Sequence, residues 1–544
     1  MVVAALVLLP LVAILWIALT PSAEVWRHLV TTVLPGSLKT TLLLMLGVGV
    51  TTGVTGVATA WLVTMCNFPG RRILDWALLV PLAVPTYIVA FAYVEVLDYT
   101  GPVQSLIRSL FGFQTSRDYW FPEIRSLGGA IFVMGAVLYP YVYLTTRASF
   151  LIQSAATLDV SRTLGASPYG LFFRVALPLA RPAIVIGISL ALMECLNDIG
   201  AVTFFGVKTL TFSVYDTWLH RSSLGGAAQL ALAMLLMVFA LLWLERFERR
   251  KQRFHSGGGS KHRPPTRFDL NPWQTALALL LCLAPILAGF VVPALLLMDL
   301  ASRRLEDLFS PGFLDAIWNS FSLAAVAALL TVVVSVALAY ALRLNPKGSL
   351  KGAVRLASIG YAIPGTVLAI GILVPLASFD NFVDARMEFW FGLDTGLLLL
   401  GSGAGLVYAY IVRFLAVSYG QVEGGFGRIT PHFDMAARTL GRNTGQTLYQ
   451  VHLPILKPVL LSAALLSFVD CMKELPATIL LRPFGFETLA TTVYEAASRE
   501  AFGDAALPSL AIVLVGLLPV IYLARSSASS FRTRMTRRQP GFAD

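Results

Sequence analysis

Long apolar stretches, separated by short polar segments, recur along the whole chain. A stretch of about 20 apolar residues is long enough to cross a bilayer as a helix. We count about twelve such stretches. They lie at roughly 2–19, 37–64, 73–95, 127–150, 182–203, 226–244, 273–298, 316–342, 353–377, 396–418, 457–480 and 505–524. The pattern therefore predicts an all-α integral membrane protein with about 12 transmembrane helices.

Composition and charge agree with a membrane protein. Hydrophobic residues make up 57% of the chain and charged residues 13%, and the mean hydropathy is +0.74. Soluble domains are about one quarter charged. If the N-terminus is cytoplasmic, the inner segments carry a clear excess of Lys and Arg, and the outer segments carry more acids than bases. The net charge of +11 then follows from the positive-inside rule, with both termini cytoplasmic and no nucleic-acid partner.

The four cysteines lie in or beside apolar stretches and form no CxxC pair: Cys66, Cys195, Cys282 and Cys471. We expect them to be small buried residues, and neither a disulfide framework nor a zinc site is predicted.

The chain contains an internal repeat. RTLGASPYGLFFRVALPLARP at 162–182 and RTLGRNTGQTLYQVHLPILKP at 438–458 are identical at eight of 21 positions. Two shorter pairs repeat as well: TLTFSVY (209–215) with TLATTVY (488–494), and VP (84–85) with IP (363–364). Each half holds six spans, an even number, so both halves have the same orientation. The prediction is two parallel six-helix repeats, with a path between them.

The boundaries follow from composition. The segment 245–272 is basic, then rich in Gly and Ser, then in Pro, which is typical of a flexible linker in water. We therefore expect a first half at 1–244, a cytoplasmic linker at 245–272, a second half at 273–524 and a basic cytoplasmic tail at 525–544.

The repeated polar segment predicts a helix–bend–helix element in each half, called here the first elbow (about 154–182) and the second elbow (about 430–458). In the first, a helix over 154–164 ends at Gly165, Ser167 caps a second helix, and Pro168 is its first residue. In the second elbow, Gly441 ends the first helix. Asn443 and Gln446 form a capping box there.

A Leu-Pro pair is expected to close the second helix of each elbow, at 177–178 and 453–454. The alternative is an ordinary connecting loop. Ordinary loops vary in length between repeats, whereas the distance from the glycine to the Leu-Pro pair is twelve residues in both copies. The fixed spacing favours a rigid docking element.

This spacing resembles the EAA loop of ABC-importer permeases. The copies read DVSRTLG…VALP (159–178) and MAARTLG…VHLP (435–454). They depart from the EAA pattern at Val160 and Ser161, and at Met435, which stands where the acid is expected, one residue after Asp434.

The resemblance implies that each elbow is a coupling helix for one of two copies of a cytoplasmic ABC ATPase. The chain itself would bind no cofactor, and the partner would use ATP and Mg. The implied coupling residues are Asp159, Arg162, Gly165, Ser167, Leu177, Pro178, Asp434, Ala436, Ala437, Arg438, Gly441, Asn443, Leu453 and Pro454.

Fusion of two permease halves, and the stretch KELPATILLRPFGFETLATTVYE (473–495), resemble ferric-iron importer permeases. The resemblance implies a bacterial inner-membrane permease that receives ferric iron from a periplasmic or extracellular binding protein at outer loops such as 96–126 and 378–394. Thiamine and organophosphonate permeases share this architecture and remain alternatives.

A secondary transporter driven by an ion gradient would have no ATPase for the elbows to bind. A membrane enzyme would need a catalytic cluster that the sequence lacks, and the chain has no GxxxxGK[ST] motif for ATP hydrolysis.

Acids lie at matching positions after each elbow, in MECLNDIG (193–200) and DCMKELPA (470–477). Their spacing of four residues places each pair on one helix face. Acids at bilayer depth cost roughly 2.5–3.5 kcal/mol each, so they should face the bundle interior or water. They either line a translocation path without a stable metal site or make structural contacts, such as a pair between Lys473 and Asp470. The candidate path residues are Glu194, Asn197, Asp198, Asp470, Lys473 and Glu474.

Overall fold

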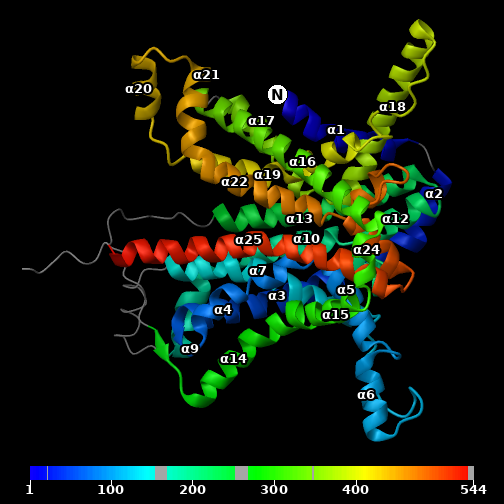
Figure 1. Cartoon of the computed structure of the whole chain (residues 1–544), viewed down its shortest axis with the longest axis vertical. Coiled ribbons are helices and arrows are strands. Elements are labelled where there is room, and N and C mark those ends of the chain that lie inside the picture. The colour runs from blue at the N-terminus through cyan, green and yellow to red at the C-terminus, as the bar shows by residue number, and fades with distance from the viewer. Residues whose placement is uncertain (21–22, 153–167, 251–266, 346–347, 537–544) are drawn as a thin grey trace, which may run out of the picture. The chain divides into compact units, whose positions relative to one another are not determined.

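The computed structural model describes residues 1–20, 23–152, 168–250, 267–345 and 348–536. Within these ranges, eleven helices are long and apolar enough to span a membrane. A twelfth span results if the bent pair Arg71–Ala83 and Thr86–Phe111 counts as one. The all-α membrane fold is confirmed (Figure 1).

The chain forms two compact units that do not coincide with the two sequence halves. Unit 1 comprises Met1–Ser37, Leu210–Val238 and Arg304–Arg499, and unit 2 comprises Leu38–Thr209, Phe239–Arg303 and Glu500–Asp544. Each unit therefore combines the middle of one half with terminal segments of the other. Neither half holds all the residues of a compact unit.

Unit 1 is entirely helical in its described residues. Its elements are α1 (Val2–Leu19), α2 (Ala23–His28), η1 (Leu29–Val33), α12 (Leu210–Leu219), the first part of α13 (Leu224–Arg250), η5 (Leu305–Phe309), α16 (Pro311–Leu344), α17 (Gly348–Ala357), η6 (Gly360–Ala362), α18 (Gly365–Phe391), α19 (Ala404–Phe426), α20 (His432–Thr439), α21 (Thr444–Thr447), η7 (Leu448–His452), α22 (Leu453–Met472), α23 (Thr478–Leu481) and α24 (Leu489–Ser498).

Unit 2 adds one two-residue parallel strand pair to its helices. Its elements are α3 (Leu34–Met65), β1 (Cys66–Asn67), α4 (Arg71–Ala77), η2 (Val80–Ala83), α5 (Thr86–Leu97), α6 (Pro102–Phe111), α7 (Leu127–Ile152), α9 (Pro168–Leu171), η3 (Phe172–Ala176), α10 (Leu177–Asn197), α11 (Gly200–Phe204), the second part of α13, β2 (Phe268–Asp269), α14 (Pro272–Ile286), η4 (Leu287–Val291), α15 (Val292–Ser302) and α25 (Phe502–Thr536).

Several boundaries differ from the sequence prediction. The span expected at 353–377 begins at Gly365, because the chain breaks at Ile363–Pro364. The first residues of the expected linker continue α13 to Arg250, and most of the remaining linker lies outside the described residues. The described part of the basic tail continues α25 to Thr536.

The repeated Val-Pro and Ile-Pro pairs break the two halves in the same way. Pro85 and Pro364 are both N-caps, with φ −59 and ψ 144 in one half and φ −59 and ψ 142 in the other. The residue before each proline is extended, with ψ 121 in both cases. Proline disfavours the helical conformation in the residue before it, so these two pairs account for the matching breaks.

The Leu-Pro pairs do not close a helix, and that prediction was wrong. A five-residue π-helical turn comes directly before each pair, and the helix then continues as α10 or α22. The N–H of Leu453 bonds the carbonyl of Leu448, five residues back. Proline has no N–H and its ring crowds the carbonyl four residues earlier, so the wider turn accommodates it within a continuous helix.

Two further π-turns of five residues precede a helix whose second residue is proline. η1 precedes Leu34–Pro35 and η4 precedes Val292–Pro293. Among the described residues, four π-turns therefore precede an aliphatic residue followed by proline, and η4 lies within the span Pro272–Ser302. The pair alone does not predict the turn, because Pro10 and Pro375 also follow aliphatic residues and lie inside α1 and α18.

Close packing of α7 against α10 depends on a glycine. A Cβ placed on Gly187 would lie 2.5 Å from Thr145 Oγ1 and 2.6 Å from Val142 Cα. On α19, by contrast, a Cβ on the exposed Gly424 would meet nothing within 4 Å.

We predict that Gly187→Ala lowers the stability of the purified chain by about 1–3 kcal/mol, because the backbone of α7 cannot give way as a side chain can. Gly424→Ala should leave the melting temperature unchanged or raise it, since alanine favours the helix. Thermal unfolding can be followed by reaction of the four buried cysteines with a thiol-reactive dye. Equal melting temperatures for the two variants would contradict the packing argument.

Candidate functional site

The second elbow has the geometry that its sequence predicts. α20 ends before Gly441, which has φ +74, a conformation that favours glycine. Asn443 Oδ1 accepts the N–H of Gln446 at 2.8 Å, and Gln446 Oε1 accepts the N–H of Asn443 at 3.1 Å. This capping box starts α21, which continues through η7 into α22. The bend is therefore fixed at both of its ends.

Most of the first elbow lies outside the described residues. Four of its candidate coupling residues fall there: Asp159, Arg162, Gly165 and Ser167. The described part begins at Pro168, the first residue of α9 as predicted, and Leu177 and Pro178 begin α10. In the second elbow, Leu453 and Pro454 occupy the same positions in α22.

Asp434 anchors the second elbow to the spanning helix α16. One carboxylate oxygen accepts hydrogen bonds from Arg343 at 2.6 and 3.1 Å, and the other accepts Nε2–H of His452 at 2.8 Å. His452 is fully buried, and the two charged side chains are about one fifth exposed. One carboxylate thus joins three segments: the end of α16, the elbow helix α20 and the π-turn η7.

The same arginine also fixes the backbone that leads into the elbow. Its guanidinium donates to the carbonyls of Phe426 at 2.9 Å and Ile429 at 3.0 Å. Tyr340, one turn earlier on α16, donates to the carbonyl of Thr444 at 2.6 Å. The ring of Tyr340 also packs near His452. The elbow is therefore held by side chains from a single helix.

Sequence reasoning identified Asp434 but missed Arg343 and His452. In the sequence, Arg343 looks like an ordinary charge at the end of a span, and His452 is one polar residue in the apolar end of the second elbow. Asp434 is 91 residues from Arg343 and 18 residues from His452, in a different helix from each. The displaced acid of the motif was the available signal that a basic partner exists.

The electrostatics of Asp434 follow from these contacts. Burial raises the pKa of its carboxyl, but the hydrogen bonds and charges of Arg343 and His452 outweigh burial and leave the pKa below its ordinary value. A lowered pKa in the folded state means that the anchor contributes stability above the ordinary pKa of aspartate. That contribution is lost as the pH falls through the lowered value.

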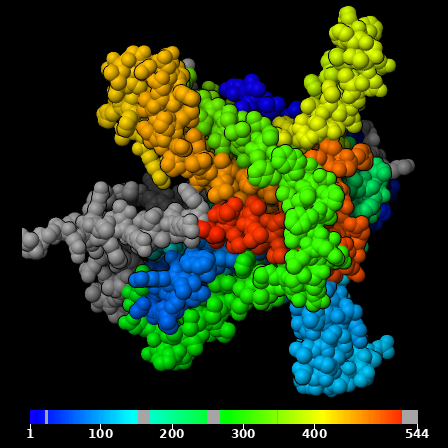
Figure 2. Space-filling model, in the orientation of Figure 1, coloured from blue at the N-terminus to red at the C-terminus, as the bar shows by residue number. Residues whose placement is uncertain are grey.

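The outer side of the elbow exposes large apolar side chains. The exposed fractions are 48% for Phe433, 52% for Met435, 78% for Leu440 and 74% for Tyr449. Of the remaining candidate coupling residues, Ala436 and Arg438 are exposed and Ala437 is buried. Figure 2 shows α20 and α21 as a projecting knob next to α22 of the same unit. Such a rigid, partly apolar knob is suited to a protein partner.

The two matched acids Asp198 and Glu474 hold backbone at the ends of broken helices. Asp198 accepts the N–H of Ala201 at 2.8 Å and the hydroxyl of Thr86. In the other half, Glu474 accepts the N–H groups of Ala477 and Thr478 at 3.0 Å each. Both acids are buried, and both accept N–H groups at the start of the short helix that follows, α11 in one half and α23 in the other.

The prediction that each acid pair shares one helix face was wrong. α10 ends at Asn197 and α22 ends at Met472, so Asp198 and Glu474 lie beyond their helices, in non-helical backbone. Glu194 and Asp470 remain helical. The backbone leaves the helical path at this point: Asp198 has ψ 111, and Glu474 follows Lys473, the C-cap of α22. Each of these two carboxylates therefore bonds to the helix that follows rather than sharing a face with the acid before it.

The charge of Glu474 is neutralised by a buried arginine. Arg413 of α19 lies 3.0 Å from Glu474, and the two side chains are 7% and 1% exposed. Gly365 makes room for this pair, since a Cβ there would lie 2.5 Å from the guanidinium. Asp470 pairs with Lys473 at 3.0 Å, where both side chains are more than one quarter exposed. Glu194 and Asn197, near the end of α10, are half-buried.

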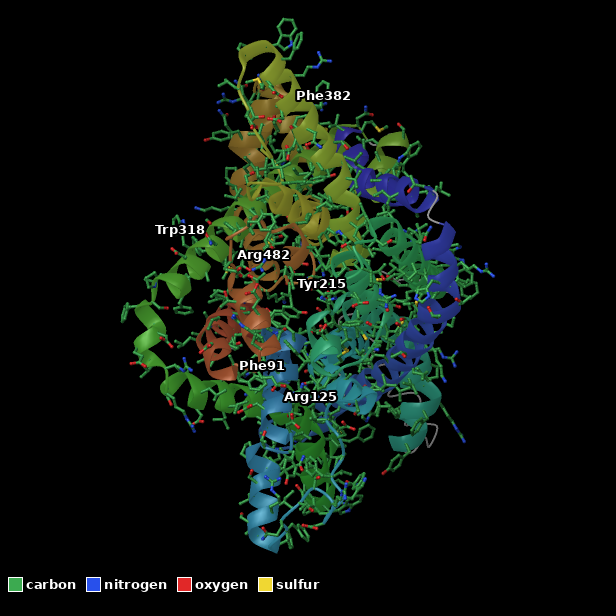
Figure 3. The ribbon with its side chains drawn as sticks, turned by 90° about the vertical axis from the view of Figure 1, so that its right-hand side faces the viewer. Phe91, Arg125, Tyr215, Trp318, Phe382 and Arg482 are labelled. Carbon is green, nitrogen blue, oxygen red and sulfur yellow. The ribbon has the colours of Figure 1, made fainter. Side chains whose placement is uncertain are left out.

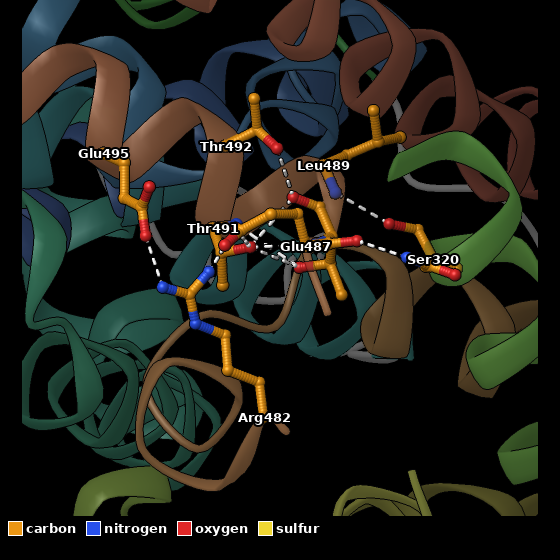
Figure 4. Close-up of polar contacts among 9 residues, drawn as sticks. Ser320, Arg482, Glu487, Leu489, Thr491, Thr492 and Glu495 are labelled. Atoms are coloured by element: carbon orange, nitrogen blue, oxygen red, sulfur yellow. Dashed lines mark hydrogen bonds and ion pairs between the residues drawn. The ribbon is translucent and has the colours of Figure 1, made fainter. Parts of the chain in front are cut away.

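The stretch 473–495 builds a charge network around Arg482 (Figure 4). Arg482 forms ion pairs with Glu487 and Glu495. Thr491 donates to Glu487 at 2.8 Å, and Asn319 of α16 donates to the Glu487 carbonyl at 2.9 Å. The network ties the loop before α24 to a spanning helix.

Next to this network, two equivalent residues of the repeat meet. Tyr215 of α12 and Tyr494 of α24 stand at the same position in the two matched seven-residue stretches, and their side chains hydrogen-bond. The charges of Arg482 and Glu495 also act on Tyr215 (Figure 3). Unit 1 therefore contains matching short helices from both sequence halves in contact.

Comparison with known proteins supports a transport role. Residues 52–253 match the family described as "Binding-protein-dependent transport system inner membrane component". The chain is 25% identical over 492 residues to the Fe(3+)-transport system permease protein FbpB 2 of Haemophilus influenzae, covering 90% of this chain and 89% of that protein. It is 22% identical over 459 residues to the ferric transport system permease protein FbpB of Actinobacillus pleuropneumoniae, covering 80% of this chain and 63% of that protein.

A shorter relative matches one part of the chain. The molybdenum transport system permease protein ModB of Escherichia coli K12 is 28% identical over 207 residues, which are 36% of this chain and 86% of ModB.

We predict that Asp434→Asn lowers the stability of the purified chain at neutral pH by about 1.5–3 kcal/mol, because charge-assisted hydrogen bonds to Arg343 and His452 are lost. The difference from the wild type should begin to shrink as the pH falls below about 4, where the carboxyl of the unfolded chain takes up a proton, and should be lost below the lowered pKa of the folded state. Thermal unfolding across pH measures this, with the exposed Asp315→Asn as the matched control. A difference that is constant with pH would contradict the anchor.

We predict that Glu474→Gln is destabilising by about 3–5 kcal/mol, because it leaves the buried charge of Arg413 unpaired. Asp470→Asn removes a more exposed pair and should cost no more than about 1 kcal/mol. Thermal unfolding distinguishes the two. If Asp470→Asn keeps its melting temperature but reduces transport, a path role for Asp470 is supported; unchanged transport would leave it as a structural contact.

Proposed function

We propose that this chain, which resembles permeases of binding-protein-dependent ABC importers and in particular fused ferric-iron transport permeases, imports ferric iron with energy from a separate ATPase. In this proposal the chain is not an enzyme and binds no cofactor of its own. Two copies of a cytoplasmic ABC ATPase use ATP and Mg, one at each elbow. A periplasmic or extracellular binding protein delivers the iron.

The observation that carries this proposal is the anchored second elbow. A docking element must present a surface to its partner and must also be attached firmly to what it moves. Leu440 and Tyr449 supply exposed apolar surface, while Asp434 and Arg343 connect the elbow to α16. Movement of the ATPase would therefore reach a spanning helix through a partly buried ion pair.

The mechanism is mechanical coupling. When ATP closes the paired ATPase subunits, the elbows move with them, and the spans switch from an inward-facing to an outward-facing arrangement. This requires elbows and both termini on the cytoplasmic side of a bacterial inner membrane, as the distribution of basic residues predicts.

Iron is favoured as the cargo because relatives that match four fifths or more of the chain are ferric-iron transport permeases. The match to a molybdenum permease covers about one third of it. Thiamine and organophosphonates are the alternative cargoes. Among the described residues no group of three or more His, Cys, Asp or Glu could hold a metal ion. Weak, successive contacts along the path would suit a transporter, which must release its ion.

The test is uptake of radioactive ferric iron into proteoliposomes that contain the chain, its ATPase and its binding protein. We expect ATP-dependent iron uptake that excess unlabelled thiamine or phosphonate does not reduce. The chain without its ATPase should hydrolyse no ATP. Saturable uptake of thiamine or a phosphonate, with none of iron, would overturn the assignment of the cargo.

The coupling role is tested in the same system by Gly441→Val. A β-branched residue at φ +74 is strained, so the bend should distort and ATP hydrolysis should continue while uptake falls at least tenfold. Gly424→Val is the matched control, because neither glycine has a neighbour within 4 Å of a built Cβ but only Gly441 has a positive φ. Normal uptake by Gly441→Val would refute the elbow as the coupling element.

A further inference from the structure

The short helix α6 exposes its apolar side chains and covers its polar ones, the reverse of a helix on a water-exposed surface. Its apolar residues recur at positions three and four apart, and the exposed fractions are 58% for Leu106, 70% for Leu110 and 70% for Phe111. A surface helix in water normally buries such a stripe against the protein. Here the apolar stripe faces away from the rest of unit 2.

The polar face of α6 is instead covered by the segment that surrounds it. Gln104 donates to the carbonyl of Leu97 at 2.9 Å and accepts from the hydroxyl of Tyr119 at 2.6 Å. Arg108 donates to the carbonyl of Tyr99 at 2.8 Å and lies over the Tyr99 ring. The polar groups that face inward are thus satisfied within residues 97–119, and an apolar surface is left outside.

The second half repeats this arrangement at the matching place in its own unit. The outer part of α18 lies at the repeat-equivalent of α6 and also exposes a ring-rich face, with exposed fractions of 58% for Phe382 and 79% for Phe389. On its other side, Asp380 accepts the N–H groups of Leu399 and Leu400 at about 3 Å. One turn later, Asp384 accepts the N–H of Thr395 at 2.7 Å.

We propose that these two segments, the α6 arm (residues 98–125) and the α18 arm (residues 379–400), rest with their apolar faces in the lipid interface. The occupant of each face is the bilayer itself. On the α6 arm the exposed stripe is apolar. On the α18 arm the exposed Arg386 lies over the Phe382 ring, so its long side chain can hold the guanidinium at headgroup depth while the rings contact hydrocarbon.

The placement of α6 supports this occupant. α6 begins five residues after α5 ends, and the two belong to the bent pair that is apolar enough to enter a membrane. Within unit 2, α6 runs crosswise to the spanning helix α25 (Figures 1 and 3). A helix that lies across the spans at their end lies along the membrane surface.

Two further features fit an interfacial position. Trp120 in the α6 arm is 87% exposed and Trp390 in the α18 arm is 68% exposed, and tryptophan is enriched where lipid meets water. The α6 arm contains three acids and three bases, so no electrostatic attraction to anionic lipid is needed. Apolar contact alone should hold it on a zwitterionic bilayer.

The α6 arm leads into the N-terminal end of α7, and the C-terminal end of α7 leads toward the first elbow. On the orientation in the proposed function, the arm lies on the outer leaflet. Only the assignment of the arm to the outer leaflet rests on the proposed function. The contact of the arm with lipid does not rest on it, because that contact depends on the chain alone.

The experiment uses the full chain in phosphatidylcholine nanodiscs, without ATPase, binding protein or cargo. A nitroxide is attached at Leu110→Cys, and at Ser116→Cys as the matched control in the exposed return segment of the same arm. Phe389→Cys and Asp394→Cys form the second pair. The native cysteines are buried and serve as an unlabelled background.

The measurement is the accessibility of each nitroxide to oxygen, which concentrates in lipid, relative to a water-soluble nickel chelate. We expect the ratio at Leu110→Cys and Phe389→Cys to be at least fivefold higher than at the control of each pair, at low and at high salt. Equal ratios within a pair would overturn the proposal for that arm. So would a low ratio that rises only when the binding protein is added, since the face would then be a protein-docking site. Failure of iron uptake would not affect this result.

Discussion

Every backbone polar group inside a membrane must find a partner within the protein, because hydrocarbon offers none. This constraint is most severe where a helix is interrupted at bilayer depth. The chain has such interruptions at Pro85 and Pro364, and again after α10 and α22. At the latter two, a buried carboxylate supplies the acceptor: Asp198 in one half and Glu474 in the other. Two of the acids that the sequence suggests as part of an ion path therefore accept backbone N–H groups at the interrupted helix ends.

The buried carboxylate has a different side-chain partner in each half. Asp198 receives a neutral hydroxyl from Thr86, the residue after the Val-Pro break. In the second half the equivalent position is Gly365, and the space left by its missing side chain admits the guanidinium of Arg413. The geometry of the break is therefore the same in both halves. The second carboxylate has an arginine partner in addition to a hydroxyl, that of Thr478.

Much of the fold can be read from the sequence, because apolar length and proline placement act locally. The eleven spans of the described residues, or twelve with the bent pair, depend on residues close together in the chain, as do the bend at Gly441 and the capping box at Asn443. What could not be read depends on long-range contacts. Arg343 reaches Asp434 across 91 residues, and nothing near either residue specifies that pairing.

The wrong prediction for the Leu-Pro pairs has a local cause. Proline after an aliphatic residue was interpreted as the end of a helix, whereas a π-turn lets the helix continue at the cost of one wider turn. The exchange of terminal segments between the two units could not be predicted for another reason. A repeat in sequence fixes which residues are equivalent, but not which copy they pack against.

A continuous helix from α21 through η7 to α22 changes how the elbow can act. If the Leu-Pro pair ended the helix, a flexible joint would separate the elbow from the span and absorb movement. A helix that runs on, with His452 of its π-turn bonded to Asp434, has no such joint. Force applied at the exposed Leu440 then has two stiff routes into the bundle, one along α22 and one through Arg343 into α16. In the proposed coupling, the anchor and the π-turn together would make the second elbow a stiff lever on the bundle.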